Sequence, residues 1–127
     1  MSTSRRALLI LDHGTRSAET NARLGTFARA VGERRSDWLV AHAHMELGQP
    51  DVPTAVDALV DAGATEIHVH LHFLSAGMHV RETIPELIDE ARARHPEIPI
   101  TVGEPLGFDE RLIDLVIDNA AREPGGR

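Results

Sequence analysis

Short apolar runs alternate along the chain with longer stretches in which apolar residues recur at helical spacing. The runs are rich in leucine, isoleucine and valine, which is typical of buried strands, and the stretches between them predict amphipathic helices. The predicted strands cover 7–11, 38–45, 65–73 and 98–102, and the predicted helices cover about 17–35, 51–62, 81–95 and 108–122. This βαβαβαβα order predicts an α/β fold, with an open parallel four-stranded sheet and helices on both faces.

The length of the chain is that of one domain. Its 127 residues fall in the common size range for a single domain, which we assign to residues 1–122. The closing Glu-Pro-Gly-Gly-Arg sequence, residues 123–127, predicts a flexible tail. The apolar run at 7–11 is too short for a secretion signal or a membrane span. We therefore expect a cytoplasmic protein that has no membrane partner.

Composition narrows the possible partners and chemistries. The formal net charge is -7 and aromatic residues make up only 3% of the chain, so phosphate backbones are repelled and bases find no stacking platform. Nucleic acid is therefore not an expected partner. The absence of cysteine excludes disulfides, thiolate metal sites and iron–sulfur clusters.

Side chains that can bind a metal or accept a proton follow three of the predicted strands. In open parallel sheets ligands bind outside the carboxyl ends of the strands. His13 follows the first strand, Glu46 follows the second, and His79 lies after the third strand, just before a predicted helix. Neutral imidazole binds cobalt, iron, nickel or zinc and also accepts protons. We take His13 and His79 as candidate metal ligands, and Glu46 as a third ligand or proton acceptor. The alternative is that each histidine only bonds its own loop and that Glu46 caps a helix.

The other strand histidines alternate with apolar residues, so each set shares one strand face. One set is His42 and His44, and the second is His68, His70 and His72. The favoured interpretation is a polar cluster under a helix or at a subunit contact. A secondary cluster that holds metal, with His72 as its best member, is the alternative.

Two other functions fit parts of the pattern. The His-Gly-Thr sequence at 13–15 also suggests a histidine-type phosphohydrolase. That chemistry places an arginine immediately before the nucleophilic histidine, whereas Asp12 stands there and its charge repels phosphate. A non-catalytic metal-binding or metal-delivery module is an alternative of a different class.

Three segments, 8–24, 44–96 and 104–116, carry a family resemblance over nearly the whole chain. They contain His-Gly-Thr-Arg, Met-Glu-Leu and Gly-Met-His-Val-Arg-Glu-Thr-Ile-Pro in this order. The chain resembles the half-length sirohydrochlorin chelatases of the CbiX type, in the class II chelatase superfamily. The resemblance implies a chelatase-like fold and insertion of a divalent metal into sirohydrochlorin, in cobalamin-type or siroheme-type biosynthesis. Cobalt is the first candidate, with iron or nickel next. The metal is a substrate, and no permanently bound cofactor is expected.

The resemblance also implies roles for individual residues. His13 and His79 bind the incoming metal and help to deprotonate the macrocycle, and Glu46 supports them. Met78 stands where many members carry arginine, so one contact to the substrate is absent.

A tetrapyrrole carries peripheral carboxylates that need N–H, O–H or cationic partners. The candidates in the two loops are Thr15, Arg16, Ser75 and Arg81. For the two arginines, surface salt bridges are the alternative.

A tetrapyrrole has two broad faces, whereas one four-stranded domain offers a single wall. Longer relatives carry two such domains, so we expect a homodimer. Candidate contacts are the face of His68, His70 and His72 and the apolar residues Phe73, Leu74 and Met78. The alternative is a monomer with a shallow open cleft.

Overall fold

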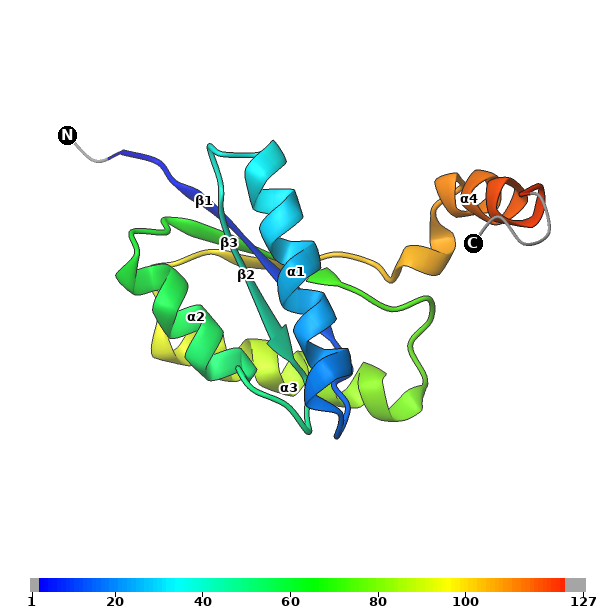
Figure 1. The fold of residues 1–127 in the computed structure, drawn as a ribbon. Helices are drawn as coiled ribbons and strands as arrows, with labels where there is room; N and C mark the ends of the chain where they lie inside the picture. Colours follow the sequence, from blue (N-terminus) through cyan, green and yellow to red (C-terminus); the bar gives the residue numbers. More distant parts are fainter. Residues whose placement is uncertain (1–2, 123–127) are drawn as a thin grey trace.

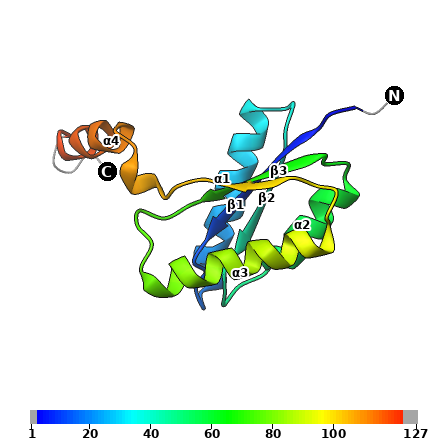
Figure 2. The same ribbon diagram turned by 180° about the vertical axis from the view of Figure 1, so that it is seen from behind.

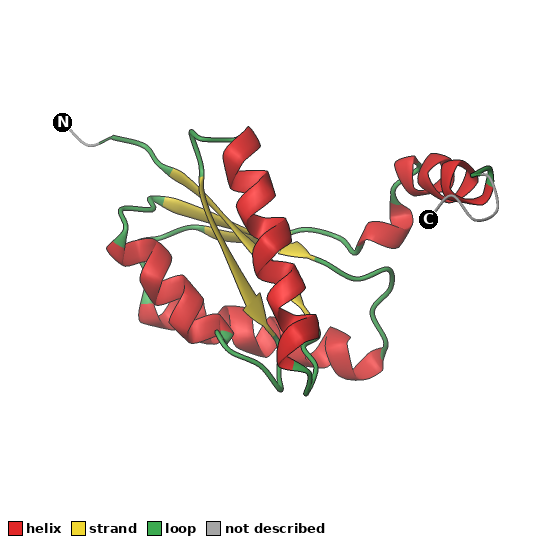
Figure 3. Ribbon diagram, viewed as in Figure 1, coloured by secondary structure: helices red, strands yellow, loops and turns green. Residues whose placement is uncertain are grey.

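Four parallel strands form the centre of the molecule, which a computed structural model describes for residues 3–122. They are β1 (Arg6–Asp12), β2 (Leu39–His44), β3 (Glu66–Leu71) and β4 (Ile100–Val102). All pairings are parallel and the strand order is β2-β1-β3-β4 (Figures 1 and 3). The predicted parallel sheet is therefore confirmed. The predicted tail, 123–127, lies outside the described residues, and one domain over 1–122 stays a prediction.

Helices cover both faces of the sheet, as predicted. α1 (Ala18–Arg34) lies on one face, and α2 (Val52–Asp61) and α3 (Met78–Arg94) lie on the other (Figures 1 and 2). A short 3-10 helix, η1 (Leu106–Phe108), precedes α4 (Arg111–Ala120). In both views α4 lies away from the sheet and covers neither face.

Two predicted helix boundaries were wrong. The third helix begins at Met78 instead of 81, because Gly77 ends the extended loop and no residue in the next turn opposes a helix. His79 therefore lies in the first turn of α3 and not before it. The fourth helix begins at Arg111 instead of 108, since a 3-10 turn ends at Phe108 and Asp109 returns to extended backbone.

Successive side chains along each strand point to opposite faces of the sheet, so the core has two layers. Leu9, Leu11 and Val69 have no exposed surface and pack toward α2 and α3. On the opposite face Ile10 packs with Leu24 and Ala28 of α1. Burial of these side chains on both faces holds the strand ends at fixed positions.

The face of the sheet that carries α1 is only half covered by the described helices. α1 contacts β2 and β1, and it makes no extensive contact with β3 or β4. The register pairs Ile10 with both His42 and His70, so the two histidine sets lie on this same face. His42 lies on β2, on the covered side, whereas His68 and His70 lie on the open side.

Candidate functional site

The carboxyl ends of β1 and β2 are joined where the site begins. The N–H of Met45 donates to the Asp12 carbonyl at 2.9 Å, and the N–H of Glu46 donates to the His13 carbonyl at 3.2 Å. Gly14 has φ +88°, and a Cβ built there would lie 1.8 Å from the Glu46 carbonyl oxygen. Only glycine permits this approach, so the two loops fix each other's position.

His79 and Glu46 come together from different elements. His79 lies in the first turn of α3, and its Nε2 is 3.3 Å from Oε1 of Glu46, which follows β2. Both side chains are open to solvent, with 67% and 40% of their surface exposed. An exposed imidazole beside an exposed carboxylate can ligate a divalent metal or accept protons from a bound molecule.

His13 lies at the same edge but is not part of a closed ligand set. Its side chain is exposed, and its backbone carbonyl is bonded to the Glu46 loop. Within residues 3–122, no three or more His, Asp or Glu side chains are grouped closely enough to hold a metal ion. The structure thus pairs His79 with Glu46 and leaves His13 beside them on the neighbouring loop.

Sequence reasoning missed a contact next to the site between a buried histidine and a partly exposed aspartate. His44 has no exposed surface, and its Nδ1 lies 2.6 Å from Oδ1 of Asp12. Its Nε2 is also buried and is the one such side-chain atom without a hydrogen-bond partner in the described part of the chain. The signal in the sequence was a polar residue at the end of each of two adjacent strands, which the register then pairs. This contact ties the ends of β1 and β2 together directly below His13 and Glu46.

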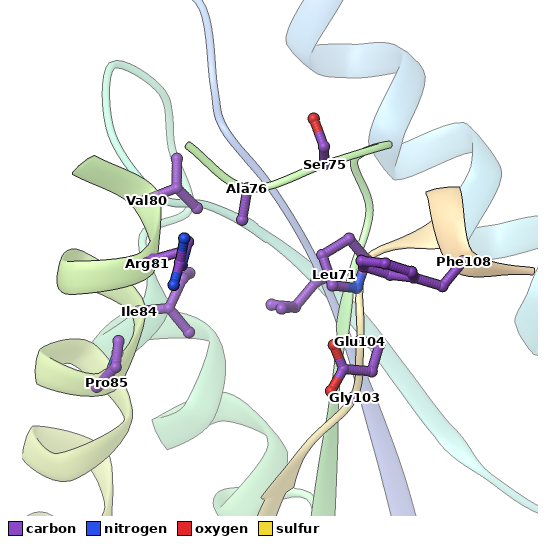
Figure 4. A pocket seen from close by; sticks show the side chains of 11 residues that line it. Leu71, Ser75, Ala76, Val80, Arg81, Ile84, Pro85, Gly103, Glu104 and Phe108 are labelled. Atoms are coloured by element: carbon purple, nitrogen blue, oxygen red, sulfur yellow. The ribbon is translucent and has the colours of Figure 1, made fainter. Parts of the chain in front are cut away.

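Two of the predicted substrate-binding residues line one cavity. Ser75, from the loop after β3, and Arg81, from α3, border a cavity of about 530 Å³. Phe108 of η1 forms the opposite side (Figure 4). Much of the remaining lining is apolar and includes Leu71 and Ile84. The cavity does not include the paired His79 and Glu46, but it begins one residue further along α3.

The other two predicted substrate-binding residues lie on the α1 side. The hydroxyl of Thr15 donates to the Asn21 Oδ1 at 2.9 Å and accepts from the Ser17 N–H at 3.1 Å. The Thr15 hydroxyl therefore stabilises the conformation of the loop after β1. Arg16 is exposed and borders a separate hollow with His42. The structure thus separates these two residues from Ser75 and Arg81.

The histidines on the α1 face stay neutral more readily than free histidine. Burial lowers the pKa of His42, His68, His70 and His72, and repulsion from His72 adds to the effect at His70. His70 Nε2 lies 3.1 Å from His72 Nδ1. This geometry fits a polar cluster, which was the favoured interpretation.

The open parallel sheet of this chain is shared by solved structures of chelatases, which places the chain among the chelatase-like α/β proteins. A model of the CbiX family matches residues 7–123. The chain belongs to the CbiX family.

Relatives of this chain are either of similar length or about twice as long. A sirohydrochlorin cobaltochelatase of Methanococcoides burtonii is 31% identical over 124 residues, covering 89% of this chain and 92% of that protein. A chloroplastic sirohydrochlorin ferrochelatase of Arabidopsis thaliana is 34% identical over 111 residues, covering 87% of this chain and 49% of that protein. The crystal structure of the sirohydrochlorin chelatase SirB from Bacillus subtilis subspecies spizizenii in complex with cobalt has a TM-score of 0.82 at 30% identity, covering 91% of this chain and 50% of SirB. The chain thus spans about half the length of several relatives.

Proposed function

We propose that this chain is a metal chelatase that inserts a divalent metal into sirohydrochlorin, with cobalt as the first candidate and iron or nickel next. The observation that carries the proposal is the contact between His79 and Glu46 beside His13, at the exposed carboxyl edge of a CbiX-family sheet. The names of the relatives support the same reaction. The metal enters as a substrate, in the cytoplasm, and no resident cofactor is required.

Insertion exchanges one divalent ion for the two protons on the pyrrole nitrogens, so the site needs ligands and proton acceptors at one place. His79 and His13 supply neutral nitrogens that bind the ion before transfer. Glu46, 3.3 Å from His79, accepts a proton or acts as a third ligand. The open arrangement of these side chains leaves room for the macrocycle, and the ligand set closes only when the ion arrives.

The cavity next to His79 is suited to the periphery of the macrocycle. Its apolar wall and the Phe108 ring can contact pyrrole carbons, while Arg81 and Ser75 can bind a peripheral carboxylate. The first turn of α3 has no side-chain cap, so its N–H groups add further donors. Arg16 would bind a carboxylate on the α1 side, and Thr15 acts by holding that loop.

We further propose that two copies enclose the substrate. Leu74 and Met78, beside the site, are large apolar side chains with 64% and 75% of their surface exposed. A second wall would cover them together with the second face of the macrocycle. Half-length chains can obtain this wall by pairing, whereas SirB is about twice as long as this chain.

Anaerobic incubation of the protein with sirohydrochlorin and Co²⁺ tests the function, because insertion changes the absorbance spectrum of the macrocycle. Rapid turnover above the rate without protein is the expected result. Tight Co²⁺ binding with no acceleration would support the metal-delivery module in place of the chelatase.

A further inference from the structure

Leu47 is a strained residue with an exposed apolar side chain, directly after Glu46 of the proposed metal site. Its backbone has φ +66°, the one positive value among the non-glycine residues that the structure describes. A side chain of this size at positive φ is an energetic outlier. With 54% of its surface exposed, Leu47 recovers little of this energy by packing. Strained backbone of this kind is concentrated at binding and catalytic sites.

Contacts on both sides of Leu47 hold its backbone in this conformation. On one side the N–H of Glu46 donates to the His13 carbonyl at 3.2 Å. On the other side Gly48 lies against α1, where a Cβ would collide with the amide nitrogen of Asn21. Figure 1 shows this loop, between β2 and α2, beside the beginning of α1. The neighbouring segments therefore fix the turn, and with it the position of the exposed side chain.

Leu47 borders a hollow on the α1 side of the sheet edge, which we call the α1-side hollow. Its volume is about 480 Å³, and Arg16, Asn21 and His42 are among the residues that line it. None of the described lining residues is acidic. Burial, with repulsion from His44, lowers the pKa of His42, so a neutral imidazole lies in the same hollow as the arginine. A cation beside apolar surface suits a ligand that has an apolar body and a carboxylate at its edge.

The α1-side hollow has a counterpart on the other side of the proposed metal site. That counterpart is the cavity of about 530 Å³ beside α3, where Arg81 and the exposed ring of Phe108 are found together. The α1-side hollow likewise combines Arg16 with the exposed side chain of Leu47. A macrocycle above the metal site, with carboxylates around its periphery, can therefore find one cation and one apolar contact on each side.

We propose that Leu47 binds the macrocycle through an apolar contact, and that the α1-side hollow is a second subsite for its periphery, where Arg16 binds a carboxylate. The proposal rests on the chelatase function proposed above and adds a substrate-binding residue to it. The strained turn then serves to present the Leu47 side chain beside the metal site. Because an apolar contact is the same before and during metal transfer, it strengthens binding of the macrocycle without accelerating the insertion step.

Leu47→Gly tests the proposal because it should move stability and substrate binding in opposite directions. Glycine adopts positive φ readily, so the urea midpoint of unfolding should rise above that of the wild-type protein. Metal-free sirohydrochlorin, titrated by absorbance, should bind about fivefold more weakly, because the exposed 54% of the leucine surface is no longer available for contact. The KM for sirohydrochlorin should rise by a similar factor, and the loss should not appear in kcat.

Leu47→Met is the matched control, since it keeps a large apolar side chain on the same turn and should bind sirohydrochlorin as tightly as the wild-type protein. Wild-type affinity in Leu47→Gly would overturn the proposal. A fall in kcat at unchanged affinity would also overturn it, because the turn would then act by placing Glu46. A loss of stability in Leu47→Gly would show that Leu47 is held by packing and not strained, with the same consequence.

The wild-type protein separates this proposal from the chelatase function. If it binds sirohydrochlorin but does not accelerate Co²⁺ insertion, the chelatase function fails, whatever the variants show. If it inserts Co²⁺ and Leu47→Gly binds sirohydrochlorin equally well, the chelatase function stands and the role of Leu47 is overturned.

Discussion

Gly14→Ala is expected to disrupt the site through the backbone alone. Gly14 separates His13 from the rest of its loop and has φ +88°. A Cβ at this position would lie 1.8 Å from the Glu46 carbonyl oxygen and 3.1 Å from Cβ of His44. The substitution changes no candidate ligand, so any loss of activity reports on the placement of His13 and Glu46.

The expected effect of Gly14→Ala has two parts, a loss of stability and a loss of turnover. A side chain at positive φ costs about 1–2 kcal/mol, and this part affects stability. The Glu46 backbone must also retreat by about 1 Å or more to relieve the overlap, and misplacement of this size can lower turnover about 100-fold. Glu46 would then move relative to His79, which is only 3.3 Å from it.

Gly63→Ala is the matched control. Gly63 also has positive φ, +106°, but a Cβ there would meet nothing within 4 Å. It should lose about 1–2 kcal/mol of stability and keep wild-type turnover. Urea unfolding and the initial rate of Co²⁺ insertion into sirohydrochlorin measure the two effects. Gly14→Ala with the stability and turnover of Gly63→Ala would refute the reasoning.

Three further predictions address the ligands, the metal and pH. His13→Ala should lower metal insertion by orders of magnitude with an unchanged circular dichroism spectrum, and Glu46→Ala should do less damage; near-wild-type turnover in a folded His13→Ala protein would place the centre elsewhere. Co²⁺ should be inserted when it is compared with Fe²⁺ and Ni²⁺ at matched free concentrations, because nitrogen and oxygen ligands discriminate poorly among these ions; robust iron or nickel insertion with no cobalt insertion would contradict this. Burial lowers the pKa of His70 and His72 from 6.5, so the folded protein binds fewer protons than the unfolded chain just below that pH, and the free energy of unfolding should fall as the pH drops through this range. Urea unfolding at about pH 7.5 and about pH 5.5 measures how far the free energy of unfolding falls between these two values. The fall should be smaller for His70→Gln than for the wild-type protein, and an equal fall would contradict the lowered pKa of His70.

The succession of strands and helices along the chain and the edge that carries the site could be predicted from sequence because both follow from local patterns. Alternation of strands and helices predicts a parallel sheet, and the carboxyl ends of β1, β2 and β3 meet at one edge because the strands run in the same direction. This is why His13, Glu46 and His79, distant in sequence, were expected at one edge of the sheet. The roles of the seven candidate site residues stay predictions.

Features that depend on contacts between distant segments could not be predicted in the same way. The bond between Asp12 and His44 requires the register of β1 against β2, which no local pattern specifies. The amphipathic pattern predicted the last helix, but a pattern does not say what the helix packs against. The direction of α4 depends on how η1 bonds the loop after β3, a contact between segments about 30 residues apart.

The central claim is that His79, through its place beside Glu46, is part of the centre that inserts the metal. The most direct test compares anaerobic Co²⁺ insertion into sirohydrochlorin by the wild-type protein, His79→Ala and His95→Ala. His95 is the matched control because it lies at the opposite end of α3, where it bonds Asp57. The wild-type protein and His95→Ala should insert the metal at similar rates, and His79→Ala should be slower by orders of magnitude while remaining folded. Wild-type turnover in a folded His79→Ala protein would contradict the claim.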